Sequence, residues 1–306
     1  MGDIDLSVQV TAGLRLINPV IVASGTWGYG DEYNDLVDIQ KLGAIICKGT
    51  TLKPRNGNPQ PRIIEVTSGI LNSVGLENIG VEALISDKAP AWAKWSVPVI
   101  VNIAGDTVEE YARVAARLEG VAGISGIEVN ISCPNVKRGG MQFGTDPVSA
   151  AEVTAAVKAS TSLPVIVKLS PNVTDIVAMA EAVEKAGADA ITLINTISGM
   201  AIDVKKRKPA LGNITGGLSG PAIKPVALLM VYKVAGSVKI PLIGCGGIMN
   251  AGDALEFILA GATAVEVGTA NLADPQAAFK IIGGLHKYLD SENIRKVSDL
   301  RGAARL

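Results

Sequence analysis

The sequence is poor in the residues on which several common kinds of site depend. Its 306 residues include three cysteines and one histidine. Cys47, Cys133 and Cys245 lie far apart and are odd in number, which argues against a disulfide framework. No CxxC pair is present, so we expect neither a metal site nor an iron–sulfur cluster of the chain's own. This cysteine usage is typical of a protein kept in a reducing cytoplasm.

Blocks of charge and long apolar runs are also missing. The net charge is −1, and the densest basic run is the short "KKRK" at 205–208. This balance argues against nucleic acid or an anionic membrane as a main partner. No apolar run approaches the roughly 18 residues of a membrane span, and the acidic, alternating start "MGDIDLSVQV" does not resemble a signal peptide. We therefore expect a soluble cytoplasmic protein.

Aromatic residues are scarce at 4%, whereas hydrophobic residues as a whole make up 48% and glycine occurs 34 times. Small aliphatic side chains must therefore fill the core, with many tight turns around it. A core of this kind suits parallel strands that are buried on both faces.

Eight short, β-branched apolar runs alternate along the chain with segments of helical periodicity. This alternation predicts a (β/α)8 TIM barrel as one domain over residues 1–306, with an open doubly wound sheet as the alternative. Asp146 and Pro147 have the types expected at an N-cap and at the first position of a helix. The predicted strands are 19–24, 44–49, 97–104, 126–132, 164–170, 190–195, 241–247 and 264–270, and the predicted helices are 107–120, 146–160, 173–188, 220–236 and 250–262.

Four segments do not fit the simple repeat. The N-terminal "LSVQVTAGLRLINP" alternates on both sides of "AG" and predicts a β-hairpin over the barrel bottom. Long excursions follow strand two (50–76) and strand six (196–219), and "PNVKRGGMQFGTDP" after strand four could act as a lid. Excursions at the carboxyl ends of barrel strands commonly carry specificity.

Polar residues stand at the carboxyl ends of six predicted strands, where a barrel has its active-site mouth. Each alone has a structural explanation, since asparagine caps loops and lysine can extend out of a strand end. Together they predict a site for an anionic or electron-rich ligand, and several amides suit a pyrimidine or flavin ring. A Schiff-base lysine is the alternative within the same fold. The six residues are Ser24, Lys48, Asn102, Asn130, Lys168 and Asn195.

Glycines follow the last two strands, in "GCGGI" (244–248) and "VGTA" (267–270). They let backbone N–H groups approach a phosphate, which this fold commonly binds there, although glycine also serves tight turns. "TGGLSG" (215–220) could add further donors. No G-x-G-x-x-G follows a strand, so a nicotinamide cofactor lacks its usual signal. An electron acceptor would have to diffuse in or arrive on another subunit.

Cys133 differs from the other two cysteines because it directly follows the fourth predicted strand, in "VNISCPNV". A buried free cysteine is usually an inert small hydrophobe, which fits Cys47 and Cys245. At a barrel mouth, a thiol with an ordinary pKa of about 8.5 can act as a general base. His286, in the C-terminal helix, is too remote to make a Cys–His protease dyad.

The motifs "NISCPN", "VIVKLSPN", "LINT", "CGGI" and "VGTA", in this order, resemble a class 1 dihydroorotate dehydrogenase. "SCPNVKRGGMQFGTDP" is most similar to the class 1B catalytic subunit, and the resemblance extends over essentially the whole chain. It implies a (β/α)8 barrel that binds one FMN and oxidises (S)-dihydroorotate to orotate in de novo pyrimidine (UMP) biosynthesis. It also implies a partner subunit with FAD and a 2Fe–2S cluster that passes electrons to NAD+, in a heterotetramer containing a homodimer of this chain.

The resemblance implies roles for individual residues. Cys133 would remove the C5 proton of dihydroorotate while C6 gives hydride to flavin N5, and Lys168 would stabilise the reduced, anionic flavin. The implied substrate-binding residues are Lys48, Asn72, Ser73, Val74, Gly75, Leu76, Asn130, Asn195 and Thr196. The implied FMN-binding residues are Ser24, Lys48, Gly49, Asn102, Asn130, Lys168, Ile194, Gly220, Gly246, Gly247, Gly268 and Thr269.

Four other functions stay open on the sequence. A class 1A enzyme would use fumarate without a partner, and a related dihydropyrimidine dehydrogenase would act on uracil. An aldolase would form a Schiff base through Lys168. A non-catalytic flavin-binding module would need no base at Cys133.

Overall fold

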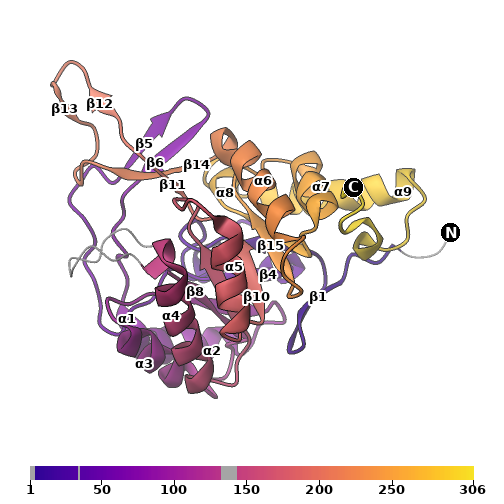
Figure 1. Ribbon diagram of the computed structural model, residues 1–306, viewed down its shortest axis with the longest axis horizontal. Helices are drawn as coiled ribbons and strands as arrows, with labels where there is room; N and C mark the ends of the chain where they lie inside the picture. The colour runs from indigo at the N-terminus through magenta and orange to yellow at the C-terminus, as the bar shows by residue number, and fades with distance from the viewer. Residues whose placement is uncertain (1–3, 34, 132–142) are drawn as a thin grey trace.

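A closed barrel of eight parallel strands forms the centre of the computed structural model, which describes residues 4–33, 35–131 and 143–306 (Figure 1). The strands follow one another around the barrel in sequence order, and the last pairs with the first. Each lies inside a predicted run, which confirms the TIM barrel. The strands are β3 (Val20–Val22), β4 (Ala44–Ile46), β7 (Val99–Ile103), β8 (Gly126–Asn130), β9 (Val165–Leu169), β10 (Ala190–Leu193), β15 (Leu242–Cys245) and β16 (Ala264–Val267).

Helices surround the barrel and begin at side chains that cap them. Thr107, Asp146 and Asp175 each accept a hydrogen bond from a backbone N–H of the first helical turn. The five predicted helices all form, as α3 (Val108–Leu118), α4 (Pro147–Ser160), α5 (Ile176–Lys185), α6 (Lys224–Val234) and α7 (Ala251–Ala260). The others are α1 (Gly80–Ala83), a π-helical turn (Leu84–Lys88), α2 (Ala89–Trp92), α8 (Thr269–Ala273) and α9 (Ala277–Ser291).

Irregular turns and an N-terminal hairpin complete the barrel's surroundings. Strands β1 (Val8–Thr11) and β2 (Leu14–Leu16) pair antiparallel. Gly13, between them, faces Pro164, which precedes β9 at the amino end of the barrel. Short 3-10 turns occupy Asp31–Tyr33, Ile39–Lys41, Phe143–Thr145, Pro221–Ile223 and Val297–Leu300. No helix among the described residues is both long and apolar enough to cross a membrane.

The excursions after β4 and β10 pair with each other in a small antiparallel sheet, which we call the roof sheet. Its strand order is β11-β14-β6-β5, built from Ile197–Gly199, Gly216–Ser219, Gly69–Asn72 and Ile63–Val66. The sequence did not predict these strands, because glycines within them are typical of turns. The excursion after β8 falls largely on residues 132–142, outside the described part of the chain.

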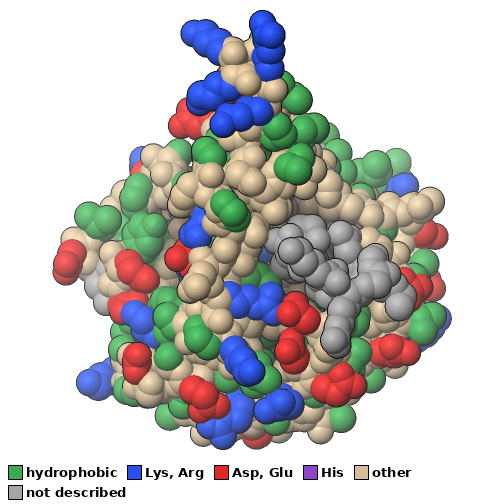
Figure 2. Space-filling view, turned by 90° about the vertical axis from the view of Figure 1, so that its left-hand side faces the viewer, with side chains coloured by type: hydrophobic (Ala, Val, Ile, Leu, Met, Phe, Trp, Pro, Cys, Tyr) green, Lys and Arg blue, Asp and Glu red, His purple; other side chains and the backbone are tan. Residues whose placement is uncertain are grey.

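A narrow hairpin projects from the roof sheet, formed by β12 (Ile202–Asp203) and β13 (Lys208–Pro209) (Figure 1). Its tip carries the basic run 205–208, whose side chains are exposed. Figure 2 shows these blue side chains gathered at the end of a protrusion. The basic run is therefore a solvated loop, as expected for a short charge run.

Candidate active site at the barrel mouth

A cavity of about 390 Å³ lies between the carboxyl ends of the barrel strands and the roof sheet. It brings together all of the predicted site residues that the structure describes. These are Ser24, Lys48, Gly49, Asn72, Ser73, Val74, Gly75, Leu76, Asn102, Asn130, Lys168, Ile194, Asn195, Thr196, Gly220, Gly246, Gly247, Gly268 and Thr269. Cys133, the predicted base, is outside the described residues, although its strand β8 ends at Asn130 beside the cavity.

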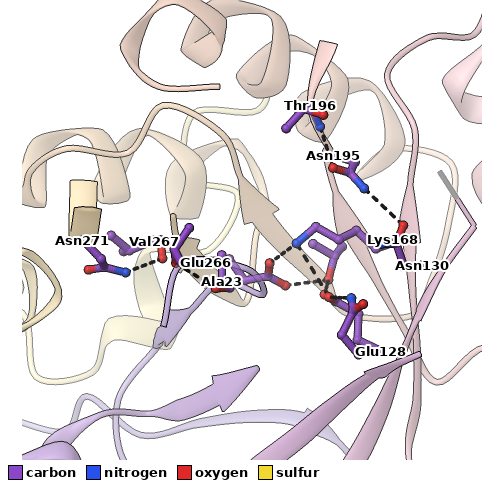
Figure 3. Close-up of polar contacts among 12 residues, drawn as sticks. Ala23, Glu128, Asn130, Lys168, Asn195, Thr196, Glu266, Val267 and Asn271 are labelled. Atoms are coloured by element: carbon purple, nitrogen blue, oxygen red, sulfur yellow. Dashed lines mark hydrogen bonds and ion pairs between the residues drawn. The ribbon is translucent and has the colours of Figure 1, made fainter. Parts of the chain in front are cut away.

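The cavity floor rests on a cluster of buried polar side chains inside the barrel, which we call the floor cluster: Asn102, Glu128, Lys168, Thr192 and Glu266. Figure 3 labels Glu128, Lys168 and Glu266 of this cluster. The Lys168 ammonium lies 2.5 Å from Glu266 Oε2 and 3.7 Å from Glu128 Oε1. Lys168 is 5% exposed, so it does not extend to solvent as a lysine at a strand end can.

Sequence reasoning missed both glutamates of the floor cluster. Glu128 sits in "GIEVN" and Glu266 in "AVEV", each within a run read only as an apolar strand. Their position in the strand could have revealed them, because side chains two residues apart on a strand point to the same side of the sheet. Glu128 stands two positions before Asn130, which already pointed to the mouth. Both glutamates are buried completely or nearly so.

The electrostatics of the floor cluster follow from this burial. Burial first, and the neighbouring Glu266 carboxylate next, raise the pKa of Glu128 above the ordinary glutamate value. Burial alone would lower the pKa of Lys168, but the acidic side chains around it, including the hydrogen-bonded carboxylate of Glu266, outweigh burial and raise that pKa. Burial also raises the pKa of Cys245 far above its usual value, so its thiol is neutral at neutral pH. The glutamates therefore hold the ammonium.

Amide side chains line the part of the cavity under the roof sheet. Asn195 Nδ2 donates to Asn130 Oδ1 at 3.2 Å, and Asn195 Oδ1 accepts from the backbone N–H of Thr196 at 2.7 Å (Figure 3). Asn72 Nδ2 donates to the carbonyl of Gly217 at 3.2 Å, across the pairing of β6 with β14. These contacts fix amides from three separate segments around one space.

Lys48 brings a second cation to the cavity wall. Its ammonium lies 3.8 Å from Glu77 Oε2, an oxygen that also accepts a 2.8 Å hydrogen bond from Arg62. The Lys48 side chain is 31% exposed, unlike that of Lys168. Since Arg62 shares the carboxylate, Lys48 keeps part of its charge available to an anionic ligand.

The glycine-rich end of the cavity has a left-handed backbone conformation that favours glycine. Gly246 and Gly247 have φ of 126° and 74°, and a Cβ on Gly247 would lie 2.8 Å from the backbone nitrogen of Lys224. Thr269 Oγ1 donates to Ser219 Oγ at 2.8 Å nearby. This arrangement leaves room for an anionic group close to backbone N–H donors.

Two unsatisfied buried atoms indicate what the cavity could hold. Asn102 Oδ1 and Ser73 Oγ are buried and have no hydrogen-bond partner among the described residues. Buried polar atoms are normally paired, so these two fit a ligand with polar edges. Together with the glycine end, they fit a ligand that combines a polar-edged ring with an anionic group. Within the described ranges, no group of three or more His, Cys, Asp or Glu side chains is placed to hold a metal ion.

The other residues that the sequence singled out lie as follows. Cys47 is buried, and burial raises its pKa to about 12, which fits an inert hydrophobe. Cys245 is also buried but lines the cavity. His286 is exposed on α9.

Comparison with known proteins adds to this geometry. Residues 6–289 match the family model described as dihydroorotate dehydrogenase. The chain is 60% identical to a protein of Geobacter sp. (strain M21) over 302 residues, covering 99% of each chain. It is 57% identical over 306 residues to one of Geotalea daltonii, covering both chains fully. It is 61% identical over 302 residues to one of Desulforamulus reducens, covering 98% of this chain and 99% of the relative.

All three relatives are named dihydroorotate dehydrogenase B (NAD(+)), catalytic subunit. The family match extends from the N-terminal hairpin to α9, so it includes the barrel, the roof sheet and the cavity between them. The chain belongs to the dihydroorotate dehydrogenase family.

Proposed function

We propose that this chain is the catalytic subunit of an NAD+-linked dihydroorotate dehydrogenase, which oxidises (S)-dihydroorotate to orotate in pyrimidine biosynthesis. The observation that carries the proposal is that two lysines, four asparagines and a glycine-rich end line the same cavity. The family match and the names of the relatives support the same activity.

The cofactor in this proposal is one FMN, held with its phosphate at the glycine-rich end and its ring above the floor cluster. When bound, FMN supplies a two-electron acceptor. Gly220, Gly246, Gly247, Gly268 and Thr269 would bind the phosphate. Ser24, Gly49, Asn102, Lys168 and Ile194 would contact the ring and ribityl chain. The unpaired Asn102 Oδ1 supports this placement because it needs a donor from a ligand.

The substrate would lie under the roof sheet, against the amides. Asn72, Asn130 and Asn195 offer both donors and acceptors to the amide edges of a pyrimidine. Lys48 would attract the carboxylate of dihydroorotate, and Thr196 with residues 73–76 would complete the wall. In this arrangement the ring is fixed by paired contacts on several edges, which positions C5 and C6 for reaction.

Cys133 is the proposed general base that removes the C5 proton. In the sequence it follows Asn130, which lines the cavity, by three residues. A positioned base contributes roughly 10²–10⁴-fold to rate.

Electrons would leave through a second subunit. The relatives' names describe a catalytic subunit acting with NAD(+), which supports a partner that binds NAD+. We infer that this partner carries FAD and a 2Fe–2S cluster, that the complex is a heterotetramer with a homodimer of this chain, and that it works in the cytoplasm. A class 1A enzyme would instead turn over with fumarate and no partner.

The test compares Cys133→Ala with the unaltered chain, each purified with its partner. We expect FMN to stay bound, as judged by its visible absorbance, and dihydroorotate oxidation to fall by roughly 10²–10⁴-fold. Cys133→Ser is the matched control, since it keeps a weaker base and should retain reduced turnover that rises with pH. Unchanged turnover in Cys133→Ala would refute the base assignment. A chain that cannot bind FMN at all would refute the flavoenzyme, and reduction of uracil in place of dihydroorotate oxidation would favour the dihydropyrimidine dehydrogenase.

A further inference from the structure

In the floor cluster, one hydroxyl group contacts the carboxyl groups of both glutamates. Thr192 Oγ1 lies 3.2 Å from Glu128 Oε2 and 2.9 Å from Glu266 Oε1, both within hydrogen-bond range. A threonine hydroxyl has one proton, so it can donate to only one of the two carboxylates. If both glutamates were ionised, the other contact would join two acceptors with no proton between them. One extra proton on a carboxyl group would satisfy both contacts.

The neighbours of each glutamate decide where that proton resides. Glu266 Oε2 accepts a charge-assisted hydrogen bond from the Lys168 ammonium at 2.5 Å, which makes Glu266 the ion-pair partner of Lys168. Glu128 lies 3.7 Å from the same ammonium, beyond hydrogen-bond range, and its Oε1 accepts from the neutral amide of Asn102 at 2.6 Å. The remaining atom, Glu128 Oε2, is then the one that donates to Thr192.

We propose that Glu128 is a neutral carboxylic acid whose proton makes the floor cluster electrically neutral beneath the ligand ring. The hydrogen bonds then run in one direction: Glu128 donates to Thr192, Thr192 donates to Glu266, and Lys168 also donates to Glu266. Every contact has a proton. The charge of the cluster is the sum of one ammonium and one carboxylate, which is zero.

The other groups that face Glu128 agree with this protonation. They come from other parts of the barrel wall and are Glu266 on β16, Lys168 on β9, and the thiols of Cys47, directly after β4, and Cys245 on β15. Burial raises the pKa of both thiols, so neither adds charge at neutral pH. Burial followed by the Glu266 carboxylate also raises the pKa of Glu128, the direction that a neutral acid requires.

The consequence concerns Lys168 and whatever ring lies above it. An ammonium has three N–H donors, and among the described residues Lys168 uses one, toward Glu266. Lys168 also lines the cavity, so a further N–H is available to the ligand. An ionised Glu128 would give the cluster a net negative charge and oppose electron uptake by the ring. Glu128 is thus a positioning residue that acts through Lys168, a step that rests on the proposed function.

The first experiment reads the proton directly, in the full chain as purified. We expect the infrared difference spectrum of the unaltered chain minus Glu128→Gln to contain the carbonyl stretch of a protonated carboxylic acid, shifted in deuterium oxide. Glutamine fits the site because its oxygen accepts from Asn102 and its amide donates to Thr192. In Glu266→Gln the lysine loses its ionised partner, so Glu128 should ionise and the band should disappear although Glu128 is still present. Absence of the band from the unaltered chain overturns the proposal.

The second experiment measures the midpoint potential of bound FMN. Glu128→Gln should leave it unchanged between pH 6 and pH 7, because a neutral group replaces a neutral group. If Glu128 were ionised, the same substitution would add one positive charge and raise the potential, which would overturn the proposal. The two experiments also separate this inference from the proposed function: a chain that shows the band but binds no FMN refutes the flavoenzyme and leaves the protonation of Glu128 established.

Discussion

The floor cluster and the roof sheet enclose the same cavity but are built in opposite ways. Lys168 and both glutamates of the floor cluster are at most 5% exposed, and each has a charged or hydrogen-bonded neighbour. The roof sheet is antiparallel, short and mostly half-buried. Backbone pairing and a few amide side chains hold it together. Changes in the floor cluster should therefore affect folding and ligand binding together. Changes in the roof sheet should affect binding with less effect on stability.

Removing the floor cation should have the largest effect. Lys168→Met leaves Glu266 buried without its counterion, and breaking a buried pair in this way costs about 3–5 kcal/mol of unfolding free energy. Urea denaturation measures the loss. Burial and the Glu266 carboxylate already raise the pKa of Glu128, and loss of the Lys168 charge, which lowers it, would raise it further, so the deficit should shrink as the pH falls toward the ordinary glutamate value of 4.5 and grow as it rises.

The matched control for that variant is Lys206→Met in the projecting hairpin. The Lys206 side chain is 67% exposed and pairs with Asp203 of its own hairpin. We expect its stability to match that of the unaltered chain. Equal losses in the two lysine variants would contradict the contrast between floor and hairpin.

Adding a methyl group in the roof sheet should have an intermediate effect, mainly on substrate binding. A Cβ on Gly217 would lie 2.0 Å from Thr196 Oγ1, so Gly217→Ala must displace either Thr196 or β14. We expect KM for dihydroorotate to rise by roughly 10- to 100-fold, because small misplacements of contact residues have effects of this size. Overpacking should reduce stability by about 1–3 kcal/mol, less than in Lys168→Met. Steady-state kinetics and urea denaturation measure the two quantities.

Gly283→Ala on α9 is the control for the roof variant, since nothing lies within 4 Å of the added Cβ. It should leave KM unchanged. A Gly217→Ala chain with normal KM would show that Thr196 does not contact the substrate.

The smallest effect is expected at the hairpin tip. Hydrogen bonds from the backbone N–H and then the side chain of Lys206 lower the pKa of Asp203. This lowered pKa stabilises the hairpin above the ordinary value of 3.8, and the contribution is lost as the pH falls through the folded value. Asp203→Asn should therefore leave global stability and activity unchanged at pH 7. It should speed hydrogen exchange of the Lys206 amide, measured by NMR, and no change in that amide would contradict the prediction.

The sequence predicted the floor better than the roof for a physical reason. β-branched runs such as 164–170 specify buried strands locally, and barrel geometry then places Asn102, Lys168 and their neighbours at one mouth. Strands β6 and β14 both contain glycine and are far apart in the sequence, so no local sequence pattern predicted their pairing. Glu128 and Glu266 were overlooked because a single acid does not change the apolar average of a strand. The base at Cys133 and the assignment of residues 1–306 to one domain stay predictions.

The pairing of β6 with β14 also bears on how the molecule folds. Asn72 and Gly217, which meet in this pair, are 145 residues apart in the sequence. Contacts of such separation form late, because the intervening chain must first lose its freedom. Between them lie β7 to β10 and their helices, and the glycine-rich end of the cavity follows β15 and β16, so the cavity needs both the roof sheet and the closed barrel. A newly made chain should therefore gain its binding cavity as one of its last folding events, and a ligand for that cavity should select fully closed barrels from unfinished ones.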